Sequence, residues 1–330
     1  MKKNKVIILK DLPKFALNSA CFATTARPVK EPMLGEVLIK VKLISIDAAN
    51  RAWLNGPTYR PAVSIGDIMP AYGIGEVVKS RSKNLKKGDL VSGELEWSEY
   101  TTKRAIFLKK VDGNYQLTDL LTYKGIAGLT AYHGLLNVAK IEPKETVLVS
   151  TAAGSVGIFV CQIARILGCK VIGLSSSDEK CDWVEKNLGI VKCVNYKGEN
   201  FSKSLKEICP EGIDVYFDNV GGNLLEQTLY RMRLKGRVVC CGAISQYDQD
   251  TTTSPKNIPG VIVTKRLKLE GFIVMDFQKE NFEALEDLSK WFEAGQLKVF
   301  TEEYKGLDSA PLALINLLKG KNLGKTIVKI

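Results

Sequence analysis

The sequence predicts an α/β protein in which a β-rich domain precedes a doubly wound parallel sheet. Residues 1–122 contain short extended runs broken by glycine and proline, a pattern typical of a compact β domain. From about residue 146, short apolar strands alternate with helices whose apolar residues recur at helical spacing. Such alternation predicts a parallel sheet with right-handed crossovers. At roughly 150 residues per domain, the 330 residues of the chain are enough for two domains.

Elements of the first domain are predicted from apolar runs between turn residues. We expect its strands at residues 37–41, 73–78, 89–93 and 105–108. The last part of the chain contains an apolar helix at 308–319 and a final strand at 325–330. We expect this part to return to the first domain, so that residues 1–122 and 291–330 together form one domain.

The second predicted domain, residues 123–290, has clear element ends. A first strand at 146–149 precedes a helix at 157–167, which Gly168 ends. A second strand at 170–174 precedes a helix at 178–188, which Gly189 ends. Further strands are expected at residues 193–196, 213–217, 236–241 and 269–275.

The composition is that of an ordinary globular protein and excludes several other classes. Hydrophobic residues make up 45% and charged residues 25% of the chain, which argues against a disordered or collagen-like protein. No apolar run approaches the roughly 18 residues of a membrane-spanning helix. The apolar run at residues 6–9 is too short for the core of a signal peptide. We therefore expect no membrane association and a cytoplasmic location.

The charge balance is basic, with a formal net charge of +11 at pH 7. A basic surface can attract nucleic acid or an anionic cofactor. Here the basic residues are scattered, without a run of five and without interleaved aromatic residues. We interpret most of this charge as a solvated surface and expect no nucleic-acid partner.

Histidine and cysteine limit the possible chemistry. His133 is the only histidine, which excludes a histidine-rich metal site, and its place at the start of a predicted helix favours a packing role. The eight cysteines form no C-x-x-C pair and mostly lie in apolar runs. We therefore expect buried thiols in a reducing compartment rather than a zinc ribbon or a redox dithiol, and no metal.

The strongest motif lies between the first strand and the first helix of the second domain. Residues 152–157 read AAGSVG, an A-x-G-x-x-G variant of the dinucleotide fingerprint in the strand–turn–helix context that the fingerprint requires. Gly154 would let the backbone approach a pyrophosphate, and Gly157 would let the helix pack closely on the strand. The free N–H groups at the helix start would face the phosphates. The alternative interpretation is a plain tight turn.

The end of the second strand bears on the choice of dinucleotide. NAD enzymes usually place Asp or Glu there to bind the ribose hydroxyls. Here Leu174 is followed by three serines, Ser175 to Ser177, so no acid repels a 2′-phosphate. Lys180 lies in the first turn of the next helix and Tyr196 ends the third strand; hydroxyls and an ammonium suit a phosphate ester. The residues favour NADP(H), although Ser177 also fits a helix N-cap and Lys180 a solvated lysine.

Three further segments lie at the same edge of the predicted sheet: two of them follow the fourth and fifth strands, and the third lies on the sixth strand. They are residues 218–222 (DNVGG), 242–247 (GAISQY) and 272–274 (FIV). Ligands of doubly wound sheets bind outside the carboxyl ends of the strands, so these segments would border the same crevice. The alternatives are a plain turn at Gly221 and Gly222 and core packing for alternate side chains around Phe272.

Together these motifs resemble one family, the zinc-independent medium-chain dehydrogenases/reductases. The resemblance is to the branch that contains prostaglandin, alkenal and curcumin reductases and plant double-bond reductases. It is specific, because the matching stretches span nearly the whole chain in family order. They are LTAY at 129–132, AAGSVG at 152–157, SDEK at 177–180, NYK at 195–197, YFDNVGG at 216–222, CGAISQY at 241–247, EGF at 270–272 and NLGKTIV at 322–328.

This resemblance implies a GroES-like substrate domain and a Rossmann domain, usually assembled as a homodimer, with NADPH as cofactor and a small-molecule substrate. The family reaction is hydride transfer to the β-carbon of an α,β-unsaturated aldehyde or ketone. From the motifs and the resemblance together, the residues expected around NADPH are Gly154, Ser155, Val156, Gly157, Ser175, Lys180, Tyr196, Asn219, Cys241, Gly242, Ala243, Ile244, Ser245, Tyr247, Phe272, Ile273, Val274 and Asn322.

Two departures from related proteins stand out. Zinc-dependent relatives have a cysteine early in the first domain and a four-cysteine lobe near residues 90–115. Here residues 45–47 read SID at the first place and no cysteine lies between positions 22 and 160, so neither zinc site can be built. In addition, the family tyrosine that helps to grip the substrate oxygen is Ala49 in this chain. Tyr59 is a candidate replacement.

Without zinc, the reaction needs a hydrogen-bond donor for the substrate oxygen, on which negative charge develops. Tyr247 is the best candidate, aided by a ribose hydroxyl of the cofactor, since a tyrosine side chain is protonated at pH 7 and can donate. The alternative is an ordinary surface tyrosine. Two other activities remain open: reduction of quinones on the same fold, and NADPH binding without turnover.

Overall fold

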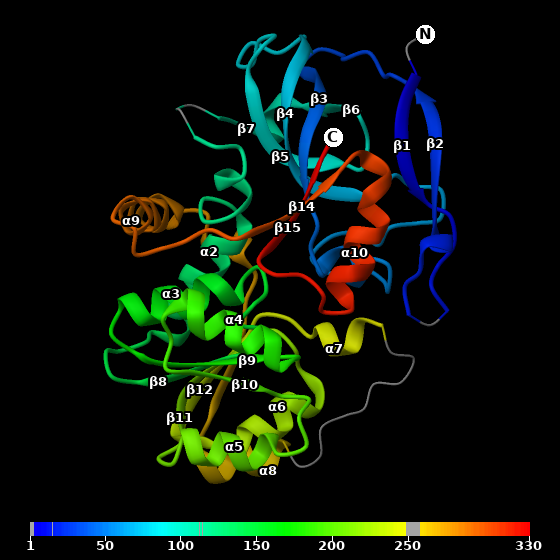
Figure 1. Cartoon of the computed structure of the whole chain (residues 1–330). Helices are drawn as coiled ribbons and strands as arrows, with labels where there is room; N and C mark the ends of the chain where they lie inside the picture. The colour runs from blue at the N-terminus through cyan, green and yellow to red at the C-terminus, as the bar shows by residue number, and fades with distance from the viewer. Residues whose placement is uncertain (1–2, 15, 112, 114, 249–257) are drawn as a thin grey trace. The chain divides into compact units, whose positions relative to one another are not determined.

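The computed structural model describes residues 3–14, 16–111, 113, 115–248 and 258–330. The chain forms two compact units, Met1–Leu121 with Thr301–Ile330, and Thr122–Phe300 (Figure 1). Each unit has its own main sheet and its own core.

The first unit consists mainly of antiparallel strands. Its elements are β1 (Lys3–Leu9), η1 (Ser19–Cys21), β2 (Phe22–Pro28), β3 (Glu36–Ser45), α1 (Ala49–Ala52), β4 (Pro70–Ser80), β5 (Leu90–Glu96), β6 (Tyr100–Arg104), η2 (Ala105–Phe107), β7 (Leu108–Lys110), η3 (Asp119–Leu121), β14 (Thr301–Lys305), η6 (Leu307–Ser309), α10 (Ala310–Leu318) and β15 (Lys325–Lys329). The main sheet has the order β14-β15-β3-β4-β5-β7, with β6 paired to β3, while β1 and β2 form a separate hairpin. Because β15 pairs with β3, the end of the chain returns to this unit.

One strand prediction in this unit was wrong. Residues 105–108 form the 3-10 turn η2 and only the first residue of β7, rather than a strand. Ile106 and Phe107 have 76% and 71% of their surfaces exposed. The apolar run in the sequence therefore does not reflect burial in a sheet, which was the basis of the prediction.

The second unit contains a six-stranded parallel sheet. Its elements are α2 (Ile126–His133), the π-helix η4 (Gly134–Ala139), β8 (Thr146–Val149), α3 (Gly157–Ile166), β9 (Lys170–Ser175), α4 (Asp178–Leu188), β10 (Lys192–Asn195), α5 (Phe201–Ile208), β11 (Ile213–Asp218), α6 (Gly222–Leu229), β12 (Met232–Cys240), α7 (Ile244–Tyr247), α8 (Ile258–Lys265), β13 (Lys268–Gly271), η5 (Val274–Phe277) and α9 (Asn281–Glu293). The strand order is β10-β9-β8-β11-β12-β13. The order reverses between β8 and β11, so the crevice expected in such sheets lies at the carboxyl ends of these two strands.

Local sequence explains where the elements of this unit begin and end. All four residues of β8 are buried, as expected for a central parallel strand covered on both faces. The helix α4 begins after Ser177, whose Oγ accepts a hydrogen bond from Lys180 N at 3.3 Å. It ends at Gly189, whose φ of 65° is left-handed and suits glycine. The structure therefore confirms both predicted ends of this helix, the N-cap at Ser177 and the stop at Gly189.

Two boundaries in this unit differ from those expected. The strand predicted at 269–275 ends at Gly271, because its partner β12 ends at Cys240, the residue opposite Gly271. The unit itself continues to Phe300 rather than to residue 290. Gln162 of α3 accepts a hydrogen bond from Lys298 N at 2.7 Å, and the Phe300 ring packs edge-on against Trp183. These contacts tie the segment after α9 to the second unit.

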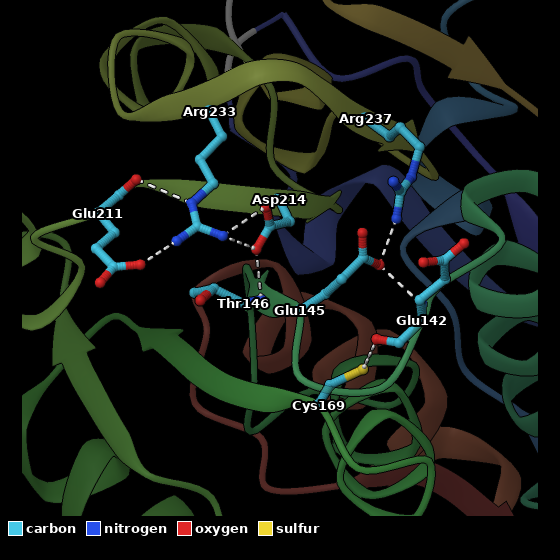
Figure 2. Close-up of polar contacts among 8 residues, drawn as sticks. All are labelled: Glu142, Glu145, Thr146, Cys169, Glu211, Asp214, Arg233 and Arg237. Atoms are coloured by element: carbon cyan, nitrogen blue, oxygen red, sulfur yellow. Dashed lines mark hydrogen bonds and ion pairs between the residues drawn. The ribbon is translucent and has the colours of Figure 1, made fainter.

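A network of charged side chains lies at the amino ends of β8, β11 and β12 (Figure 2). Arg233 Nη1 donates to both carboxylate oxygens of Asp214 at 3.0 Å, and it also pairs with Glu211 through Nη2. Asp214 accepts a further hydrogen bond from Thr146 N at 2.8 Å. Arg237 pairs with Glu145 at 2.5 Å. The network therefore cross-links the strands at the edge opposite to their carboxyl ends.

Among the described residues, no helix combines the length and the apolar character that crossing a bilayer requires.

Candidate cofactor-binding site

The turn between β8 and α3 is tightly folded. Thr151 has a left-handed φ of 51°, a strained conformation for a β-branched residue, and its carbonyl accepts a hydrogen bond from Gly154 N at 2.7 Å. A Cβ on Gly157 would lie 2.1 Å from Thr151 O and 3.0 Å from Ala152 Cα. Only glycine therefore allows α3 to start this close to the turn. The close approach at Gly157 is to the turn after β8, rather than to the strand itself.

Gly154 and Ser155 behave differently from Gly157. A Cβ on Gly154 would have Thr151 O, at 3.1 Å, as its nearest neighbour, so packing within the chain requires this glycine much less. The Ser155 Oγ is buried without a hydrogen-bond partner among the residues that the structure describes. Such orphaned polar atoms are uncommon and call for a ligand or water. Together with the positive end of α3, they suit a phosphate group.

The ends of β9 and β10 bring two predicted residues together, and a third follows in α4. Ser175 lies opposite Asn195 in the sheet, and its carbonyl accepts a hydrogen bond from Tyr196 N at 3.0 Å. The Ser175 Oγ is buried beside the Cys193 thiol and has no nitrogen or oxygen partner in the described chain. Burial raises the pKa of Tyr196, so its hydroxyl stays protonated. Lys180 lies in the first turn of α4, the helix that follows β9.

Asp218, at the end of β11, organises the loop that follows it. This nearly buried carboxylate accepts hydrogen bonds from Tyr216 Oη at 2.8 Å and from Val220 N and Gly221 N, both at 3.0 Å. Burial raises the pKa of Asp218, and the hydrogen bonds from Gly221 and Val220 oppose that rise. From the sequence, Asp218 was predicted only as part of the 218–222 segment and without a role of its own. An acid followed by a turn and Gly221 was the available signal.

Asn219 connects the two strands at which the sheet order reverses. Its backbone N–H donates to Ser150 Oγ at 2.8 Å, and its side-chain Nδ2 donates to Ser150 O at 2.9 Å. Ser150 is fully buried at the carboxyl end of β8. Sequence reasoning missed it, although a small polar residue between a buried strand and the fingerprint was visible. These bonds lock the loop after β11 to the fingerprint loop.

The loop after β12 is held by the same neighbours. Cys241 N and Gly242 N donate to Asp218 O at 2.8 and 3.2 Å, and Ser245 Oγ donates to Val220 O at 2.6 Å. Burial raises the pKa of Cys241 to about 12, so this thiol is neutral. Three loops, after β8, β11 and β12, therefore form one hydrogen-bonded assembly at the carboxyl edge of the sheet.

Tyr247 folds back over this loop. Its hydroxyl oxygen accepts a hydrogen bond from Ala243 N at 3.3 Å and lies 3.5 Å from where a Cβ on Gly242 would be. Ile244 N in turn donates to Asn219 O at 3.2 Å. The tyrosine predicted to act on the substrate is thus fixed beside the predicted nicotinamide residues of its own unit.

The remaining predicted residues lie in two places. Phe272 packs inward: its ring end would be 3.0 Å from a Cβ on Gly134, as the core interpretation of this segment expects. Ile273 and Val274 follow it and are partly exposed. Asn322 belongs to the first unit, where its buried side chain donates to Gly324 O at 3.1 Å.

The family of this chain follows from its similarity to known proteins. Residues 155–291 match the family model described as zinc-binding dehydrogenase, and residues 5–111 match the N-terminal domain of oxidoreductase. The chain is 38% identical over 308 residues to prostaglandin reductase 1 of Bos taurus, covering 92% of this chain and 91% of the relative. The chain is a medium-chain dehydrogenase/reductase. This relative places it in the double-bond reductase branch, as the motifs predicted.

Two further comparisons agree with this family. The 2-alkenal reductase (NADP(+)-dependent) of Nicotiana tabacum is 36% identical over 300 residues, which cover 89% of this medium-chain dehydrogenase/reductase and 87% of the relative. The crystal structure of CurA in complex with NADPH from Vibrio vulnificus superimposes with a TM-score of 0.94 at 30% identity, covering 98% of each chain. The GroES-like and Rossmann combination expected from the sequence is thereby confirmed.

The name of the matching family model raises the question of zinc in this medium-chain dehydrogenase/reductase. At the place where zinc-dependent relatives carry a cysteine, Asp47 pairs with the buried Lys325, and Ser45 Oγ donates to the other oxygen of Asp47. Lys325 Nζ also donates to Ile46 O at 3.1 Å. Within the described ranges, no three His, Cys, Asp or Glu side chains are grouped so as to hold a metal ion. The residues do not fit zinc at this place.

The candidate replacement for the missing family tyrosine has its own partners. Tyr59 lies in the first unit, 50% exposed, and its hydroxyl accepts a hydrogen bond from Trp53 Nε1 at 3.2 Å. Arg60 stacks over the same indole at 4.5 Å. Ala49 begins the short helix α1 that precedes this group. The three side chains form a small aromatic and cationic cluster after α1.

Proposed function

We propose that this protein is an NADPH-dependent oxidoreductase that reduces the C=C bond of α,β-unsaturated aldehydes or ketones, without zinc. The observation that carries the proposal is the assembly of three loops at the carboxyl edge of the parallel sheet. It contains the fingerprint turn, Asn219, and the 241–247 loop with Tyr247. Relatives named prostaglandin reductase and 2-alkenal reductase support the same chemistry.

The pyrophosphate of the cofactor would lie on the turn before α3. Gly154 leaves room for close approach, the buried Ser155 Oγ has hydrogen-bonding capacity to offer, and Gly157 and Val156 start the helix whose positive end faces the phosphates. Because Gly157 keeps α3 tight against Thr151, these groups are in place before any ligand binds.

The adenosine end would lie at β9 and β10. Ser175, Lys180 and Tyr196 would hold the 2′-phosphate that distinguishes NADPH from NADH, since a cation and hydroxyl donors suit a phosphate ester. The carboxylate of Asp178 in the same turn accepts a hydrogen bond from Asn195 Nδ2 at 3.1 Å. That bond holds this carboxylate at Asn195.

The nicotinamide end would be bordered by Asn219, by residues 241–245 and by residues 272–274, all in the second unit. When bound there, NADPH supplies a hydride. Negative charge then develops on the substrate oxygen, and Tyr247 would stabilise it by donating a hydrogen bond. The Ala243 N–H that already donates to the tyrosine oxygen polarises this hydroxyl and strengthens it as a donor.

The assembly and setting of the enzyme are part of the proposal. The family suggests a homodimer, and β13 is the last strand of the second unit's sheet in the described part of the chain, so a second copy has an open edge available there. The partner is a small molecule rather than nucleic acid, and the cytoplasm is the expected compartment.

The test is the oxidation of NADPH over a panel of 2-alkenals, enones and quinones, followed by absorbance, with NADH as the control cofactor. We expect turnover of a 2-alkenal with NADPH and little with NADH. Faster turnover of 9,10-phenanthrenequinone than of every enal and enone would favour the quinone reductase alternative. Tight NADPH binding without oxidation by any member of the panel would indicate a protein that binds the cofactor silently.

A further inference from the structure

The only histidine of the chain is fully buried inside the second unit, at the end of α2 rather than at the start of a helix as predicted. Its Nδ1 lies 3.0 Å from Asn137 Oδ1, one turn further along in η4. Its Nε2 lies 2.9 Å from Asn281 Oδ1, on the first residue of α9. Both ring nitrogens of His133 are therefore engaged, and the imidazole joins two helices. A buried polar ring bonded at both ends has one preferred orientation.

The same ring supports the segment between β13 and α9. The imidazole stacks on Phe277 with a centroid distance of 4.8 Å and an interplanar angle of 9°. Phe277 in turn meets Phe272 edge-on at 6.1 Å. At Gly134, the residue after His133, a Cβ would be only 3.0 Å from the Phe272 ring. Two consecutive residues, His133 and Gly134, thus contact the two ends of the segment 272–277.

Ile273 and Val274 lie between these two contacts and are partly exposed. They are the residues that the proposed function places beside the nicotinamide ring. We propose that His133 is a positioning residue: through Phe277 and Asn281 it fixes the segment 272–277 against which the nicotinamide lies. This inference rests on the proposed function, but it assigns a role to a side chain that neither binds the cofactor nor reacts.

If His133 has this positioning role, its loss should affect binding at only the nicotinamide end of the cofactor. Ser175, Lys180 and Tyr196, at the adenosine end, lie on or beside β9 and β10, whereas the segment 272–277 follows β13 at the other edge of the sheet. Adenosine 2′,5′-bisphosphate would occupy only the adenosine end. If the segment 272–277 is no longer held in position, NADPH should bind more weakly while the affinity for this fragment stays the same. General destabilisation of the protein should weaken the binding of both ligands.

The first experiment compares His133→Leu with the matched control Tyr132→Phe. Tyr132 precedes His133 and also joins α2 to α9, donating from its hydroxyl to Asp287 at 2.8 Å, so the control removes a comparable contact away from Phe277. We expect the Kd of NADPH to rise about tenfold in His133→Leu and less than about twofold in Tyr132→Phe. The Kd of adenosine 2′,5′-bisphosphate should stay within about twofold in both variants. An equal rise in the Kd of both ligands in His133→Leu, or an unchanged Kd of NADPH, would overturn the inference.

A second measurement needs no substitution. Because His133 is the only histidine, its ring gives the only imidazole signals in a ¹H–¹³C NMR spectrum. NADPH is expected to shift these signals, and adenosine 2′,5′-bisphosphate to leave them in place. If NADPH binds, as its own fluorescence reports, and the imidazole signals do not move, the positioning role is rejected while the proposed cofactor remains. If NADPH does not bind at all, the proposed function itself fails.

Phe277→Leu covers the case in which His133→Leu does not fold. It removes the ring stack and leaves both hydrogen bonds of His133 in place. We expect the same selective loss of NADPH affinity, smaller than in His133→Leu. Unchanged affinity for NADPH in this variant would contradict the role assigned to the stack.

Discussion

Single residues decide how the fingerprint turn works, and its two glycines do so for different reasons. Gly157 is required by the packing of the chain on itself, since a Cβ there would overlap Thr151 O. At Gly154, a Cβ would not come into comparably close contact with the rest of the chain. The sequence pattern predicted both positions but could not distinguish a glycine needed for folding from one that leaves room for a ligand. That distinction depends on backbone distances.

Substituting these glycines separates the two effects. We expect Gly157→Ala to lower the free energy of unfolding by about 1–3 kcal/mol, because α3 must move away from the turn. Gly154→Ala should cost less than about 1 kcal/mol and yet weaken NADPH binding, because the new methyl group lies where the pyrophosphate approaches. Urea unfolding and fluorescence titration measure the two quantities. Similar losses of stability in both variants would contradict this account.

Tyr247 is the residue on which the proposed chemistry depends. Replacing it with phenylalanine removes the hydroxyl that accepts from Ala243 N and is proposed to donate to the substrate oxygen. We expect kcat for a 2-alkenal to fall about a hundredfold, the usual effect of losing one oxyanion donor. The Kd of NADPH should change little. Steady-state kinetics at saturating NADPH provide the measurement, and a wild-type rate in Tyr247→Phe would remove the residue from the mechanism.

At the scale of elements, the sequence predicted the alternating strands and helices of the second unit. It did so because short apolar runs, typical of buried strands, alternate with segments whose apolar residues recur at helical spacing. Ser177 and Gly189 marked both ends of α4 correctly. The prediction failed where pairing decides the length: β13 stops at Gly271 because β12 supplies no partner beyond Cys240. It also failed at η2, where Ile106 and Phe107 are exposed rather than buried. A local sequence pattern specifies neither where a partner strand ends nor how exposed a side chain is in the folded protein.

The helix α4 makes a testable contribution to cofactor choice. Lys180 lies in its first turn, next to the predicted 2′-phosphate, whereas Lys186 lies exposed in its last turn. We expect Lys180→Ala to raise the KM of NADPH about tenfold and to leave the KM of NADH unchanged, since only NADPH carries the 2′-phosphate. Lys186→Ala is the matched control for charge and for helix content. An equal effect on both cofactors would argue against this role of Lys180.

For the whole molecule, the motifs found most residues of the candidate site because these follow strands at one edge of the sheet. They did not reveal the roles of Ser150 and Asp218, which come from hydrogen bonds to neighbouring loop residues. The buried thiols form a second molecular property. Burial raises the pKa of the buried thiols of Cys161 and Cys209. The thiol of Cys241, a residue that is only partly buried, also has its pKa raised by desolvation, to about 12.

These raised pKa values predict how stability depends on pH. Thiols of the unfolded chain ionise near a pKa of about 8.5, while the buried thiols stay protonated, so their contribution is complete below that pH and is lost as pH rises through the folded values. We expect the free energy of unfolding under reducing conditions to fall between about pH 9 and pH 11, by up to about 1.4 kcal/mol per pH unit for each thiol. Urea unfolding at several pH values measures it.

Two neighbouring positions on α3 provide the control for this pH dependence. Cys161 and Val160 are both fully buried, so alanine at either position leaves a cavity. Only Cys161→Ala removes a titrating group, and it should therefore flatten the decline above pH 9. Identical slopes for the two variants would show that the decline comes from other groups.

The charged network around Arg233 and Asp214 has a practical consequence for engineering. It lies at the amino ends of the strands (Figure 2). The loops proposed to bind NADPH follow the carboxyl ends of the same strands. A library of substitutions at these amino ends can therefore search for heat-tolerant variants without altering the groups that choose the substrate. Combining such a variant with changes in the 241–247 loop would let biocatalyst design treat durability and selectivity as separate problems.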